Sequence, residues 1–237
     1  MASGPAQTEV YATRLSLMNT LRLFTVKPIV RAILIAVALC VIVVLALRNY
    51  CPTSGLGLTA ARRDFHQLKN RTAVPRRSDF DRRTTLETLL QRGDDHSRWS
   101  PSRAARIEGY VVSLSAGPFE AANCYCRRDI HIMLAPRPDA PPTEQVVLEV
   151  TPRTKETHQA EASDSPAATG PAGIELDDWS LETMKRTLAG RRVRFEGWLF
   201  FDSSHAGESE NTAPGRANNW RATAWELHPI TKIEILR

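Results

Sequence analysis

The chain has 237 residues, of which 42% are hydrophobic, and a net charge of +5. This length allows one or two domains, but because apolar residues are unevenly placed, the sequence predicts one modest folded core. Four cysteines are too few for a small scaffold built on disulfides, so that class is excluded.

The N-terminal part predicts a membrane anchor. Residues 1–28 are polar to mildly amphipathic and are expected to form a cytoplasmic tail. Residues 29–47 are apolar apart from Arg31, which lies close enough to the start to reach lipid headgroups. At ~1.5 Å per residue such a helix spans roughly 28 Å, close to the thickness of a hydrocarbon core. We therefore predict a transmembrane helix over residues 29–48.

A cleaved signal peptide is the alternative interpretation. The residues before Cys51 are Arg-Asn-Tyr, which resemble neither a small-residue cleavage site nor a lipidation site, and the polar lead is long for a signal. An uncleaved anchor is favoured. Basic residues flank the helix on both sides, but a short N-terminal tail usually stays in the cytoplasm. The prediction is a single-pass protein of the inner (plasma) membrane with an extracytoplasmic C-terminal domain.

Residues 49–105 predict a basic tether next to the membrane. Between Arg62 and Arg106 there are twelve Lys or Arg and six Asp or Glu, a surplus that exceeds the net charge of the whole chain. This favours attraction to anionic lipid, or simply a solvated linker with a short helix near residues 85–91. No aromatic residues alternate with the arginines at stacking intervals, which argues against nucleic acid.

From Arg106 onward the pattern predicts a mainly β domain over residues 106–237. Residues 106–113, 129–134, 145–151, 192–202 and 220–237 show the period-two alternation of strands. One amphipathic helix opens at Asp177 or Asp178 and closes at Gly190. The low-complexity segment 152–173 is expected to be a disordered insertion. In the last strand, Trp225 and Leu227 share one face with Ile233 and Ile235, and Glu226 and His228 lie on the other.

This order of elements, three strands, a helix and two strands, resembles that of the OB-fold, a five-stranded Greek-key barrel. Gly109 in the first strand would allow the sharp bend that a small barrel needs. The tail Trp225-Glu226-Leu227-His228-Pro229-Ile230-Thr231, with Gly197-Trp198 and Asp202…His205 upstream, also resembles small exported bacterial domains with no assigned activity. Nucleases that share the barrel carry an Asp-Gly-Asp-Thr turn that is missing here, so the resemblance does not imply a nuclease.

The OB resemblance places two loops, residues 114–128 and 203–219, on one binding face. The candidate polar site joins these loops to strand residues, namely His131, Asp202, His205, Glu226 and His228. Together with thiolates these side chains could bind a divalent metal such as zinc, the candidate ligands being Cys124, Cys126, His131, His205 and His228. The spacing is not that of a strong zinc motif, so no cofactor is firmly predicted, and hydrogen bonds that stiffen the loops are the alternative.

Three further expectations concern the surroundings of this site. In an oxidising compartment Cys124 and Cys126 would form a short-ring disulfide, or one of them would pair with another thiol. Arg127 and Arg128, with Arg216 and Arg221, could attract an anionic small ligand. Trp198 could stack on a base or sugar, but cover by the helix or the tether is favoured.

The sequence thus supports a membrane-anchored extracytoplasmic OB-like binding or interaction module with an unknown ligand or protein partner, and it leans away from an enzyme. The alternative is a metal-dependent hydrolase of the phosphate-ester class that uses the His/Glu/Asp site. A nucleic-acid-binding protein is the second alternative, which requires the domain to face nucleic acid.

Overall fold

The computed structural model describes residues 27–164, 169–170 and 173–236. The described residues fall into two compact units, divided between Asn49 and Tyr50. In the first unit, α2 (Pro28–Tyr50) begins at a proline, whose fixed φ suits the first turn of a helix. Its stretch Pro28–Leu47 is long and apolar enough to cross a membrane, with a mean hydropathy of 3.1. The predicted span is confirmed to that extent, and the tail at residues 1–26 lies outside the described residues.

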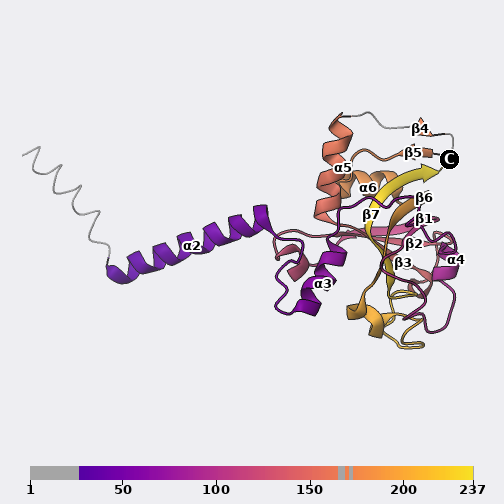
Figure 1. The fold of residues 1–237 in the computed structure, drawn as a ribbon, viewed down its shortest axis with the longest axis horizontal. Helices are drawn as coiled ribbons and strands as arrows, with labels where there is room; N and C mark the ends of the chain where they lie inside the picture. Colours follow the sequence, from indigo (N-terminus) through magenta and orange to yellow (C-terminus); the bar gives the residue numbers. More distant parts are fainter. Residues whose placement is uncertain (1–26, 165–168, 171–172, 237) are drawn as a thin grey trace, which may run out of the picture. The chain divides into compact units, whose positions relative to one another are not determined.

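The second unit is a β-barrel with short helices outside it (Figure 1). Its strands are β1 (Ala104–Ala116), β2 (Ile130–Ala135), β3 (Val146–Val150), β4 (Thr169–Gly170), β5 (Gly173–Glu175), β6 (Arg192–Phe201) and β7 (Trp225–Leu236). Its α-helices are α3 (Ala60–Lys69), α4 (Leu86–Leu89), α5 (Pro152–Asp164) and α6 (Leu181–Leu188). Among its described residues there are also 3₁₀ turns at Ala121–Asn123, Pro142–Glu144 and Ser203–Glu208.

Five of the strands close on themselves in the order β1-β2-β3-β7-β6, with β6 returning to β1. The closing pair β3–β7 is parallel, with Leu148 opposite Leu227, and the other pairs are antiparallel. This confirms the predicted fold class, a five-stranded OB-like Greek-key barrel. One detail differs: two helices, α5 and α6, lie between β3 and β6, and β5 adds a further strand along β7.

The barrel core consists of the inward faces that the alternation predicted. Ile107 and Val111 of β1, and Ile132 of β2, are buried in one cluster with side chains of β3, β6 and β7. Gly109 lies between them, where an added Cβ would come within 2.8 Å of the carbonyl oxygen of Ala135. The glycine therefore permits the close strand approach that a barrel of this size requires.

The segment expected to be a solvated tether is instead part of the folded domain. Leu86 and Leu89, from the α4 turn predicted near residues 85–91, lie in the barrel core. The buried carboxylate of Asp95 accepts hydrogen bonds from Asn211 at 2.7 Å and from Thr223 at 2.6 Å. The prediction overlooked these contacts because the segment's high charge concealed a few apolar side chains at helical spacing.

The expectation of disorder over residues 152–173 is wrong for its first half, which forms α5. The N-terminal end of α5 is held by a hydrogen bond from the Thr154 amide to the Thr151 hydroxyl, and His158 stacks on Trp179 with ring centroids 4.1 Å apart. These contacts with the folded domain supply what a polar, low-complexity segment lacks by itself. Residues 165–168 and 171–172 lie outside the described residues. Helix α6 is capped by Ser180 rather than by Asp177 or Asp178.

Candidate functional site

A cleft of about 640 Å³ lies where three segments of the domain meet. The β1–β2 loop, the β6–β7 loop and α3 with the residues before it form its walls. Its lining residues are Leu56, Leu58, Thr59, Arg62, Phe65, His66, Lys69, Phe119, Glu120, Ala121, Ala122, Tyr125, Asp202, Ser204 and His205. The two loops that were expected to share one binding face therefore line one cleft, and α3, which was not predicted, supplies its third wall.

A disulfide between Cys51 and Cys124 fixes one wall of the cleft. Cys124 and Tyr125 both have left-handed backbone conformations, with φ of 53° and 54°, which are uncommon for residues other than glycine. The amide of Leu56 donates a hydrogen bond to the carbonyl of Ala121 at 2.9 Å, which binds the same two segments together. The covalent link and this hydrogen bond thus hold a strained turn in place beside the cleft.

The rim of the cleft is apolar and exposed. Leu58 is 94% exposed, Tyr125 60% and Phe119 57%. The guanidinium of Arg128 lies 5.3 Å from the centre of the Phe119 ring, and that of Arg62 lies 5.6 Å from the centre of the Phe65 ring. Exposed apolar side chains gathered around a concave site are typical of surfaces that bind a ligand or partner.

The floor of the cleft carries buried charge. The ammonium of Lys69 donates to Glu120 at 2.8 Å, and the Lys69 side chain is only 5% exposed. Burial by itself would lower the pKa of Lys69, but the carboxylates around it, led by Glu149 and Glu120, raise it well above its usual value. Lys69 is therefore a fixed cation that links the cleft to a charged cluster beneath it.

That cluster is a chain of mostly buried acidic and basic side chains across three strands. Arg221 donates to Glu226 at 2.6 Å, and the other oxygen of Glu226 lies 3.2 Å from Nδ1 of His228. The same nitrogen lies 3.0 Å from Glu149, whose second oxygen lies 3.2 Å from Nε2 of His131. Opposite charges alternate from Arg221 through Glu226 and His228 to Glu149, which offsets the cost of removing them from water.

His228 is held in its charged form by this environment. Burial would lower the pKa of its imidazole, but the carboxylates of Glu149 and Glu226 outweigh burial and raise the pKa to about 10. Burial would likewise raise the pKa of Glu149, yet His228 and Lys69 hold it well below its ordinary value. Each group stabilises the charge of the other.

Three buried side chains have an arrangement that could hold a metal ion. Ligand atoms of Asp129, Glu149 and His228 all lie within 4.8 Å of one another, and Nε2 of His228 has no hydrogen-bond partner among the described residues. Burial and the neighbouring Glu149 raise the pKa of Asp129 to about 6. Because a metal coordinates the neutral form of imidazole, a metal at this site would have to displace the proton of His228.

The structure brings together most of the predicted site residues, in two groups. His131, Glu226 and His228 belong to the buried chain, joined through Glu149. Asp202 and His205 line the cleft. His205 lies 2.8 Å from Glu208 and 4.0 Å from Asp202, and among the described residues no ion pair joins it to the buried chain.

The face of the last strand that carries Glu226 and His228 is not exposed to solvent at the start of β7. Glu226 and His228 are both fully buried, because Glu149 and the ring of Phe200 cover them from neighbouring strands. Phe200 in turn packs against Phe65 of α3, with ring centroids 4.9 Å apart. The polar pair is therefore interior, beneath α3.

The disulfide contradicts the prediction that Cys124 is a metal ligand. Cys124 pairs with Cys51, which was the expected alternative of another thiol, so Cys124 offers no thiolate to a metal. Cys126 lies outside the disulfide and outside the three-residue group that could hold a metal.

The expected anion-attracting arginines are mostly engaged within the domain. Arg221 is fully buried on Glu226, Arg127 pairs with Glu156, and Arg128 donates to the carbonyl of Ala116 at 3.0 Å. Trp198 is covered by the segment that was predicted to be a tether, which was the favoured expectation. Its indole nitrogen donates to the carbonyl of Ala73 at 2.7 Å, and Arg71 lies over its ring.

Sequence reasoning overlooked Glu149, Lys69, Asp129 and Glu120. Glu149 stands in the run Val-Val-Leu-Glu-Val, where a single carboxylate between apolar neighbours was the available signal. Lys69 was one of many basic residues in a segment interpreted as solvated, and nothing in its spacing distinguishes it.

The fold and the site define the described chain as a closed five-stranded β-barrel domain with a cleft between its loops, preceded by an apolar helix that could span a membrane. Comparisons with protein-family models, curated proteins and solved structures found no match. The function is therefore argued from the geometry of the site.

Proposed function

We propose that this protein is a membrane-anchored extracytoplasmic binding module, with α2 as a plasma-membrane anchor and the cleft of the barrel domain as the ligand site. The observation that carries the proposal is the cleft itself. It is built from the two loops that border the binding face of an OB-fold, and a disulfide and a rigid charged floor hold it in shape.

The disulfide supports the extracytoplasmic orientation. Cys51 follows α2 directly, and its bond to Cys124 joins the start of the domain to the β1–β2 loop. Structural disulfides persist in oxidising compartments and are rare in the cytosol. An enzyme reporter fused to the C-terminus tests this orientation. Alkaline phosphatase activity in cells supports it, whereas activity only of a cytoplasmic fluorescent reporter contradicts it and would revive the nucleic-acid alternative.

The lining favours a ligand with an apolar or aromatic face and a polar edge. Phe119 and Tyr125 offer exposed rings, while Glu120, Asp202 and His205 offer hydrogen-bonding groups closer to the floor. Binding is favoured over catalysis because His228 and Glu149, two groups whose pKa values are strongly shifted, are buried beneath the cleft rather than exposed to a substrate.

Amide NMR spectra of the full chain in detergent micelles test the cleft with a panel of nucleotides, sugars and aromatic amino acids. We expect at least one probe to shift amides of residues 116–128 and 203–209 together, and Tyr125→Ala to weaken that response several-fold. Val74→Ala is the matched control, since Val74 is 62% exposed and does not line the cleft. No joint response, or an equal loss in both variants, would refute the assignment.

The group of Asp129, Glu149 and His228 supports a second candidate, a metal-dependent protein. All three side chains are buried, so a metal there would be shielded from a phosphate-ester substrate and would support the fold more readily than hydrolysis. Stoichiometric zinc in the purified full chain, lost in His228→Ala, would support this candidate. Absence of bound metal after incubation with zinc at pH 8 would remove it.

A further inference from the structure

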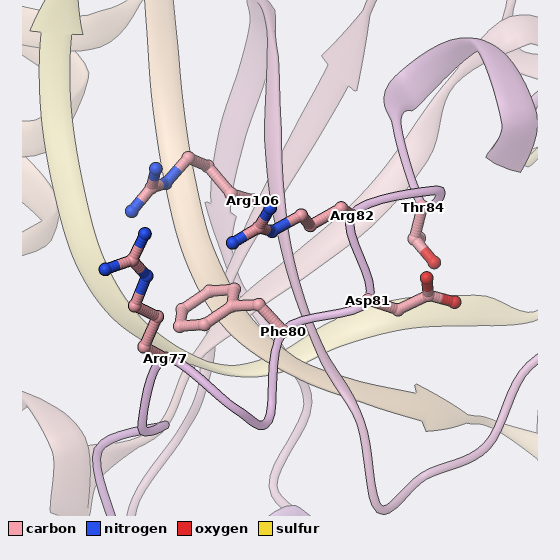
Figure 2. A pocket seen from close by; sticks show the side chains of 6 residues that line it. All are labelled: Arg77, Phe80, Asp81, Arg82, Thr84 and Arg106. Atoms are coloured by element: carbon pink, nitrogen blue, oxygen red, sulfur yellow. The ribbon is translucent and has the colours of Figure 1, made fainter.

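A second cavity, of about 760 Å³, lies on the domain and shares no lining residue with the cleft. It is lined by Arg77, Phe80, Asp81, Arg82, Thr84 and Arg106. Figure 2 shows the guanidinium groups of Arg77, Arg82 and Arg106 gathered around the ring of Phe80. Three cations on one small concavity repel one another unless an anion lies between them.

The nearby carboxylates neutralise only part of this charge. Arg106 pairs with Glu196 at 2.7 Å and lies 5.6 Å from the centre of the Phe80 ring. The carboxylate of Asp81 accepts from the Arg83 amide at 3.1 Å and pairs with the Arg83 side chain at 3.5 Å. In the described part of the chain, no ion pair is formed by Arg77 or Arg82, so two guanidinium groups are available to a ligand.

The backbone that carries these arginines is fixed to the barrel before any ligand binds. The Asp81 amide donates to the carbonyl of Ala104 at 2.8 Å, and the Ala104 amide donates to the carbonyl of Asp79 at 2.9 Å. Arg103 donates to the carbonyls of Ser78 at 3.0 Å and Phe80 at 2.9 Å. Only the side chains remain to be ordered on binding, which lowers the entropic cost.

We infer that this cavity binds a phosphate group, with Arg77 and Arg82 as the direct ligands and Arg106 held in place by Phe80 and Glu196. Guanidinium groups match the oxygens of phosphate in bidentate hydrogen bonds, and charge-assisted bonds of this kind are stronger than neutral ones. The Phe80 ring offers an apolar surface for the part of the ligand that carries the phosphate. Both a phospholipid headgroup and a soluble phosphate share this chemistry.

The test uses the full chain in nonionic detergent micelles at about 0.15 M salt, where nonspecific attraction is screened. Two probes are titrated by calorimetry and amide NMR: inorganic pyrophosphate and a short-chain phosphatidylglycerol, with short-chain phosphatidylcholine as the lipid without net charge. The test variant is Arg77→Gln with Arg82→Gln. The control is Arg76→Gln with Arg83→Gln, which removes the same charge from adjacent exposed positions that do not line the cavity.

We expect saturable binding of at least one anionic probe, with shifted amides near Phe80, at least tenfold weaker binding in the test variant and less than a threefold change in the control. Binding of pyrophosphate alone identifies a soluble phosphate as the source, and binding of phosphatidylglycerol alone identifies a lipid headgroup. Equal weakening in both variants, or no saturable binding of either anionic probe, overturns the inference. An unchanged Tm in both variants shows that the domain remains folded.

Discussion

Removing the disulfide between Cys51 and Cys124 should destabilise the domain by about 4 kcal/mol, because the bond closes a loop of 73 residues. In the chain-entropy treatment a crosslink of this span removes about 15 cal/mol/K of entropy from the unfolded chain, which gives that figure at room temperature. Cys51→Ala with Cys124→Ala is the preferred perturbation. Alanine keeps the Cβ at residue 124, so the left-handed backbone there is equally strained in both proteins.

Urea unfolding of the full chain in micelles, followed by tryptophan fluorescence, measures this loss, since Trp179 and Trp225 are fully buried. Cys126→Ala is the control, because that residue is outside the disulfide, and we expect it to cost less than about 1.5 kcal/mol. If the double variant lost less than about 1 kcal/mol, or no more than the Cys126 variant, the disulfide would not be what holds the cleft wall in place.

Three further predictions concern the buried charges and the segment of residues 50–105. Lys69→Met should cost about 3 kcal/mol or more at pH 7, because it removes a buried cation that stabilises the carboxylates of Glu149, Glu120 and Asp129. Arg63→Met on the exposed face of α3 should change the free energy of unfolding by less than about 0.5 kcal/mol. A similar cost for both variants would contradict the role of Lys69. The pKa of His228 is raised above its unfolded value, so the stability that its charge contributes is complete below pH 6.5 and is lost as the pH rises to about 10. Urea unfolding at a series of pH values should show this decline in the free energy of unfolding, and His228→Gln should abolish it. The same pH dependence in the variant would exclude His228 as the source. Leu89→Ala should lower the free energy of unfolding by about 2–5 kcal/mol, measured by calorimetry, because Leu89 is fully buried. Leu58→Ala should change it very little, because Leu58 is 94% exposed. Equal Tm values for the two variants would mean that residues 50–105 are not part of the core.

The strands could be predicted from the sequence because the alternation of apolar and polar residues along one strand depends only on which face of the sheet is buried. The alternation within residues 106–113 and 192–202 puts Ile107 with Val111, and Phe195 with Leu199, on the apolar faces of their strands, and all four side chains lie in the core. The helix now identified as α6 was also predicted, although its cap is Ser180. These are local signals, read over a few residues at a time.

Only part of the candidate site could be predicted from the sequence, because its residues are joined by contacts between distant segments. His228 was identified, but its strongest partner, Glu149, lies on β3 and is brought close only by the parallel β3–β7 pairing that closes the barrel. Lys69 comes from a segment whose charge indicated a solvated linker. Its burial became visible only when α3 was seen to cover the polar pair.

The sequence by itself determined the apolar helix, the mainly β character of the C-terminal half and the order of the five barrel strands, since hydrophobic periodicity and length are properties of consecutive residues. Only the tertiary structure decided that residues 50–105 belong to the domain, that Cys124 pairs with Cys51 and that Glu226 and His228 are interior. The physical reason is that burial, ion pairing and disulfide geometry depend on which remote segments become neighbours, and barrel closure sets those neighbours.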